Sequence, residues 1–123
     1  MFILAREDIM NIQIFGRKKS FDTKKAERYF KERKIKFQFV DLDEKGISKG
    51  ELNSIKQKIK INDLINESSK EYKQLNLDKI RSVEMKEEII LKNPRVINAP
   101  IVRNGREATV GYQKEVWDTW FEK

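Results

Sequence analysis

The stretch that decides the fold runs from Asn11 to Lys34 and reads NIQIFGRKKSFDTKKAERYFKERK. Its first part, with Ile12, Ile14 and Phe15, is typical of a short buried strand. A basic loop follows this strand, and an amphipathic helix follows the loop. The N-terminus of a helix favours anions, because its first N–H groups are unpaired and its dipole is positive there. We therefore expect any functional site of the protein to involve this loop.

The helix after the loop is expected to begin at Ser20 or Asp22, which are both good N-cap residues, and to bury Ala26, Tyr29 and Phe30. Alternating apolar and polar side chains then predict a second strand that ends near residue 42. A strand, a helix and a strand with short joints form a βαβ unit. Its two strands should be parallel and its crossover right-handed.

The middle of the chain, about 48–92, is predicted to be helical throughout. Capping boxes pair Ser48 with Glu51 and Ser68 with Glu71, and each should open a helix. The last helix of this section should stop before Pro94. Helices are expected at about 48–59, 61–64, 68–75 and 82–91.

After this section the sequence pattern again predicts strands. Asn104-Gly105 predicts a tight hairpin between a strand at 99–103 and a strand at 106–110. A final helix should pack a bulky apolar face against the core. That face consists of Val116, Trp117, Trp120 and Phe121.

This order of elements predicts an α/β fold of the thioredoxin-like (glutaredoxin-like) type. A mixed four-stranded sheet should be flanked by helices, with the helical insertion between a βαβ half and a ββα half. We expect a single domain over residues 10–123. Residues 1–9 should be an N-terminal extension that is either disordered or an artefact of an upstream start site. They lack the basic start of a signal peptide, and no apolar run could span a membrane, so we expect a cytoplasmic protein.

The net charge of +7 is concentrated in one segment. Ten basic and three acidic residues lie between Arg17 and Lys36, so this segment carries the whole excess. Such a patch attracts a small anion, nucleic acid or an acidic protein surface, although a solvated helix face would look the same. The chain has no cysteine and no histidine. Thiol nucleophiles, disulfides, imidazole bases and the usual zinc ligands are therefore excluded, and we expect no metal site.

Several further segments, taken in order, resemble the arsenate reductase-like (ArsC/Spx) family over nearly the whole chain from Met10. They are Ile14-Phe15-Gly16, Lys24-Lys25-Ala26, and the stretches 37–42, 72–76, 93–102, 111–112 and 115–117. Members of this family typically have C-x-x-C or C-x-x-S where the loop meets the helix. The resemblance places Ser20 and Thr23 at those two positions. It also places Ala99 where an arginine usually helps to hold an oxyanion, and Pro100 where the family has a cis-proline.

The resemblance therefore implies a vestigial site made of Ser20, Thr23, Ala99 and Pro100, with no catalytic residue. A serine hydroxyl cannot perform the redox half of arsenate reduction, which needs thiols. The loop could still bind an anion or a partner, while the alternative is that its hydroxyls only cap the helix and its lysines are solvated. The candidate binding residues are Arg17, Lys18, Lys19, Ser20, Thr23 and Lys24.

The favoured function is that of a non-catalytic binding or regulatory protein similar to the Spx branch of the family. That resemblance implies the C-terminal domain of the RNA polymerase α-subunit as one partner. Nucleic acid is less well supported, because the patch has few aromatic side chains on which bases could stack. The alternative is the function that the family name implies, a glutaredoxin-dependent arsenate reductase or another glutathione-linked oxidoreductase. Glutathione would be a cofactor only in that case, and otherwise we expect none.

Overall fold

The computed structural model describes residues 11–121, and the expectation for residues 1–9 lies outside them. Four strands form one sheet in the order β2-β1-β3-β4. β1 pairs in parallel with β2 and antiparallel with β3, and β3 pairs antiparallel with β4. The predicted mixed sheet and its α/β class are confirmed. The strands are β1 (Ile12–Gly16), β2 (Phe37–Asp41), β3 (Ile101–Asn104) and β4 (Glu107–Val110).

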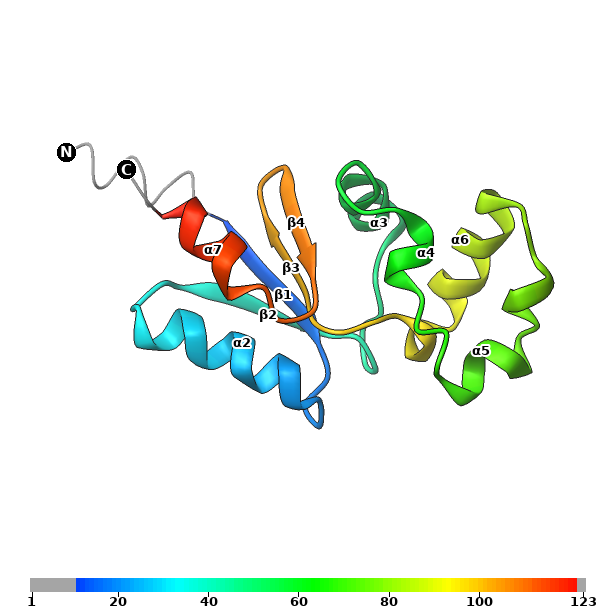
Figure 1. Cartoon of the computed structure of the whole chain (residues 1–123), viewed down its shortest axis with the longest axis horizontal. Helices are drawn as coiled ribbons and strands as arrows, with labels where there is room; N and C mark the ends of the chain where they lie inside the picture. Colours follow the sequence, from blue (N-terminus) through cyan, green and yellow to red (C-terminus); the bar gives the residue numbers. More distant parts are fainter. Residues whose placement is uncertain (1–10, 122–123) are drawn as a thin grey trace.

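One face of the sheet is covered by α2 (Phe21–Glu32) and α7 (Lys114–Trp120), which lie side by side (Figure 1). The helix α2 buries Ala26, Tyr29 and Phe30 as predicted. Trp117 is completely buried, and its Nε1 donates to Thr109 Oγ1 at 2.8 Å. The prediction for Val116 was wrong, because this side chain is exposed. Successive residues of a helix point about 100° apart, so a neighbour of the buried Trp117 turns toward solvent.

The helical insertion lies on the opposite side of the sheet (Figure 1). Its buried side chains are almost all aliphatic, and they pack on Phe15, Val40 and Ile101 of the sheet. Val83 and Met85, in the helix predicted at about 82–91, are exposed and do not take part in this packing. The elements of the insertion are α3 (Lys49–Lys56), α4 (Ile61–Leu64), α5 (Lys70–Gln74), η1 (Leu77–Lys79), α6 (Val83–Lys92) and η2 (Pro94–Val96).

The predicted N-cap of α5 is shifted by one residue in the structure. The box at Ser48 and Glu51 is present, but α5 is capped by Ser69, whose Oγ accepts from Tyr72 N at 3.1 Å. Ser68 lies one residue earlier, in a turn where its N–H donates to the Asn66 side chain.

The hairpin shows a similar shift. Asn104 pairs with Glu107, so the loop consists of Gly105 and Arg106. Gly105 has a φ of 59°, which suits the first central residue of a type II′ turn.

Candidate functional site

Ser20 is the N-cap of α2. Its backbone is extended, and its Oγ accepts a hydrogen bond from Thr23 N at 3.1 Å. The backbone of the same residue is also fixed, because Ser20 N donates to Arg17 O and Ser20 O accepts from Lys24 N. The hydroxyl that stands where the family has its reactive thiol is therefore used to start the helix. The prediction that Ser20 caps α2 is confirmed.

Thr23 is completely buried beneath the loop. Its Oγ1 accepts from Arg17 N at 3.3 Å, and its methyl group lies against Gly16. A Cβ on Gly16 would come within 2.4 Å of Thr23 Cγ2, so only glycine lets the strand pass this close. The Thr23 side chain is therefore enclosed by the loop and the strand, and its role in binding an anion or a partner stays a prediction.

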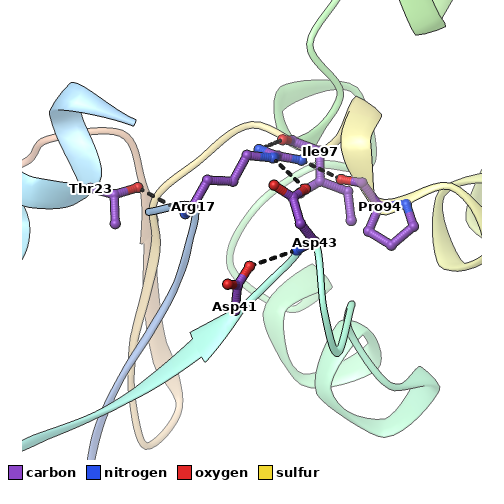
Figure 2. A network of polar contacts seen from close by, with 6 residues as sticks. All are labelled: Arg17, Thr23, Asp41, Asp43, Pro94 and Ile97. Carbon is purple, nitrogen blue, oxygen red and sulfur yellow. Dashed lines mark hydrogen bonds and ion pairs between the residues drawn. The ribbon is translucent and has the colours of Figure 1, made fainter. Parts of the chain in front are cut away.

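The guanidinium of Arg17 joins three segments of the chain (Figure 2). Its Nη1 donates to Ile97 O at 2.8 Å, its Nη2 donates to Pro94 O, and its Nε donates to Asp43 Oδ1 at 3.1 Å. Asp43 N in turn donates to Asp41 Oδ1 at 2.9 Å. Three of the five N–H donors of Arg17 are thus engaged and its charge faces a carboxylate. Arg17 therefore holds the β1–α2 loop to the β2–α3 turn and to the segment 94–97 by hydrogen bonds.

The other predicted loop residues remain at the surface. Lys18 is largely exposed and lies 4.0 Å from both Asp41 and Glu44, which makes these ion pairs loose. Lys19 and Lys24 are also exposed.

The residues expected beside the loop are found on the segment that leads into β3. The Ala99–Pro100 peptide bond is cis, as the resemblance implies. Ala99 is half-buried and packs against the aliphatic cluster of the insertion. The position of the usual arginine therefore contributes an apolar contact and no charge.

An open depression of about 420 Å³ lies next to the loop. Asp43, Glu71 and Arg95 were not among the predicted site residues, and they come from the β2–α3 turn, from α5 and from η2. They meet the loop only through tertiary packing, so no local pattern could have identified them. Arg17 pairs with Asp43 within this site. Among the residues 11–121, the cations Lys19 and Arg95 and the carboxylate Glu71 have no ion pair. The residues that line it are Arg17, Lys19, Ser20, Asp43, Glu71 and Arg95.

The side chains that line the depression are two arginines, a lysine, a serine and two carboxylates. It contains no thiol or imidazole, since the chain has none. In residues 11–121, no group of three acidic side chains is placed to hold a metal ion. The described helices also include none that is long and apolar enough to cross a membrane.

Three exposed cations lie along one side of α2. Lys24, Arg28 and Lys31 fall within about 60° of one another around the helix axis, opposite the buried Ala26 and Phe30. We call these three residues the basic stripe. Within the described residues, no member of the stripe has a carboxylate oxygen within 4 Å.

Phe21 stands at the N-terminal end of the basic stripe, and 74% of its surface is exposed. The ammonium of Lys25 lies 5.5 Å from the centroid of the Phe21 ring and 4.3 Å from that of Tyr112. These cation–π contacts connect Phe21 to the joint between β4 and α7. Among residues 11–121, an exposed aromatic ring thus stands at one end of a row of three cations that have no ion pair.

Comparisons with known proteins agree with this architecture. An arsenate reductase from Vibrio cholerae has a TM-score of 0.79 and 22% identity, with 87% of this chain and 94% of that chain covered. An ArsC family related protein from Bacteroides fragilis has a TM-score of 0.81 and 19% identity, with 90% and 98% covered. An arsenate reductase (ArsC) related protein from Brucella melitensis has a TM-score of 0.67 and 19% identity, with 93% and 97% covered. At these identities the likeness establishes the thioredoxin-like fold alone.

The comparison with curated proteins gives no match. The family model described as "ArsC family" matches residues 15–120, which span β1 to α7 and so include both halves of the sheet and the insertion. The chain therefore belongs to the ArsC family, as a member without cysteine.

Proposed function

We propose that this ArsC-family chain is a non-catalytic binding protein of a regulatory, Spx-like kind, and that it binds through α2 and the preceding loop. The observation that carries the proposal is a contrast within this region. Ser20 caps the helix and Thr23 is buried, while Lys24, Arg28 and Lys31 point to solvent without ion pairs in the described residues. At the two positions where the resemblance expects reactive side chains, Ser20 caps the helix and Thr23 is buried beneath the loop. The exposed positive charge of α2 is therefore the feature that we propose for binding.

The non-catalytic half of the proposal predicts no arsenate reduction. The purified protein is given arsenate, glutathione and glutaredoxin, and the rate is compared with that of a protein-free blank. We expect the same rate in both, because a serine hydroxyl cannot form and release a disulfide. Turnover that disappears in the Ser20→Ala variant would instead support the family's reductase activity and the use of glutathione.

The binding half is tested by site-specific photocrosslinking in the native host. A benzophenone amino acid replaces Arg28 in the basic stripe, and in a matched control it replaces the exposed Lys70 on α5. We expect a defined crosslinked protein from position 28 and not from position 70. The purified candidate is then titrated against the chain, and the C-terminal domain of the RNA polymerase α-subunit, which the family resemblance suggests, is titrated first. Equal crosslinking from both positions would contradict the proposed surface.

A further inference from the structure

We propose that Phe21 and the basic stripe together bind an acidic peptide segment that carries an apolar side chain. This inference rests on the proposed function and names the chemical class of its partner. The ligand is thus a segment of another protein, recognised by one apolar contact and a row of ionic contacts. Two features of α2 support it: the exposure of Phe21 and the geometry of the cations next to it.

Phe21 is the most exposed of the large apolar side chains in the described chain, at 74%, compared with 53% for Met85 and 49% for Val83. It occupies the first residue of α2, where capping by Ser20 requires no aromatic ring. An exposed ring beside cations is a typical component of protein interfaces, in which aromatic residues contribute much of the binding energy. Phe21 therefore offers a contact for an apolar side chain.

The cations define the shape of the remaining contact. Lys24, Arg28 and Lys31 are separated by four and three residues, so they form one row about 10 Å long at a rise of about 1.5 Å per residue. With Phe21 one turn earlier, the whole surface spans about 15 Å. Carboxylates separated by four and three residues on a partner helix repeat with the same spacing. A segment of about ten residues is long enough to cover this surface.

The flanks of the stripe favour a peptide over nucleic acid. Glu32 is exposed on one side of the stripe, and Glu27 is half-buried on the other side. These carboxylates limit the positive charge to a single row and would repel the second strand of a duplex. Single-stranded nucleic acid usually needs several aromatic platforms, whereas this surface presents one fully open ring.

The test compares three fluorescein-labelled probes by anisotropy at 150 mM salt. The first is a helical peptide with three glutamates separated by four and three residues and a tryptophan one turn earlier. The second has serine in place of this tryptophan, and the third is a 12-base-pair DNA duplex. We expect the first peptide to bind at least tenfold more tightly than either of the others. Equal affinity of the two peptides, or tighter binding of the DNA, would overturn the inference.

Variants of the chain then assign the two contacts. Phe21→Ser should remove the difference between the peptides, and K24E/R28E/K31E should remove binding of both. K49E/K70E/K73E makes the same change in charge on exposed lysines of the insertion and should leave binding intact. Melting curves by circular dichroism check that each variant is folded.

The outcomes separate this inference from the proposed function. A crosslinked partner from position 28 without binding of either peptide leaves the proposed function standing and rejects the acidic peptide. Peptide binding that survives K24E/R28E/K31E rejects the basic stripe for both.

Discussion

The two faces of the sheet are packed with different kinds of side chain. Under α2 and α7 the core is aromatic, and Trp117 contacts Tyr29 and Phe30 at centroid distances of 5.1 and 5.2 Å. Polar bonds fix this face as well, because Trp117 donates to Thr109 and Tyr29 donates to Asp118. Under the insertion the buried side chains are almost all aliphatic.

This difference indicates which half of the molecule is the rigid platform. Aromatic pairs with fixed polar ends allow few alternative packings, whereas aliphatic side chains can be exchanged or rearranged at lower cost. The proposed binding surface lies on the outside of the aromatic half. The loop between β1 and α2 lies between the two halves, where Arg17 joins them.

The packing of the aromatic face is tested most directly by Trp117→Ala. The substitution removes the largest completely buried side chain and leaves the Thr109 hydroxyl without its partner. We expect the free energy of unfolding to fall by about 3–5 kcal/mol, measured by urea denaturation. Val116→Ala on the same helix changes an exposed side chain and should cost less than about 0.5 kcal/mol. Similar losses for the two variants would contradict the packing described for α7.

The aliphatic half is probed by Leu64→Ala in α4. Leu64 is completely buried among other aliphatic side chains, so the loss consists of transfer and cavity terms alone. We expect a loss of about 2–4 kcal/mol. Hydrogen exchange should show faster opening in the insertion and little change in α2. Equal acceleration in α2 would show that the two halves unfold as one unit.

The hydrogen bonds by which Arg17 joins the two halves are tested by Arg17→Gln. The variant leaves the carbonyls of Pro94 and Ile97 and the carboxylate of Asp43 without their shared donor. We expect a loss of about 1–3 kcal/mol by chemical denaturation, since unpaired polar groups carry a desolvation cost. Lys18→Gln, which removes only loose surface pairs, should change stability by less than about 0.5 kcal/mol. An Arg17 variant as stable as the Lys18 variant would show that the loops are held by other contacts.

The sequence predicts the fold well because periodicity and capping act over short distances. The core residues of α2 were identified from their spacing, and the N-cap was narrowed to Ser20 or Asp22 from residue type, of which the structure shows Ser20. Errors arose where two neighbours compete for one role, as Ser68 and Ser69 do before α5.

The site was less predictable for a physical reason. Neither the burial of Thr23 nor the bonds from Arg17 to Pro94 and Ile97 can be derived from local patterns, because both depend on contacts between distant segments. Arg95 and Glu71 reach the depression beside the loop in the same way.

A smaller effect is expected for Ser20→Ala. If Ser20 acts only as a cap, its loss leaves the N–H of Thr23 unpaired and costs about 1 kcal/mol. Ser20→Asp restores a capping oxygen and a favourable charge at the helix N-terminus, so it should recover most of this loss. The free energies come from thermal and urea unfolding. A Ser20→Asp variant less stable than Ser20→Ala would indicate that the serine has a role other than capping.

The smallest effect concerns the bond between Tyr29 and Asp118, at 2.5 Å, which attaches α7 to α2. Burial, followed by the hydrogen bond to Asp118, raises the pKa of Tyr29 above its usual value of 10. The hydrogen bonds from Tyr29 and Lys114 lower the pKa of Asp118. The Tyr29 contribution to stability is therefore complete below about pH 10 and is lost as the pH rises through the raised pKa. The Asp118 contribution is present above about pH 4 and is lost as the pH falls through the lowered pKa.

Tyr29→Phe removes the phenolic proton and keeps the ring. We expect a loss of about 0.5–1 kcal/mol at pH 7, because one hydrogen bond disappears while the aromatic packing remains. Between pH 10 and 12 the wild type should lose more stability than the variant, which keeps Tyr72 and its raised pKa, so the two curves approach each other. Urea denaturation at a series of pH values measures both slopes. Parallel curves above pH 10 would mean that Tyr29 ionises as easily in the folded chain as in the unfolded one. The hydrogen bond between Tyr29 and Asp118 would then contribute nothing to the stability of the aromatic face.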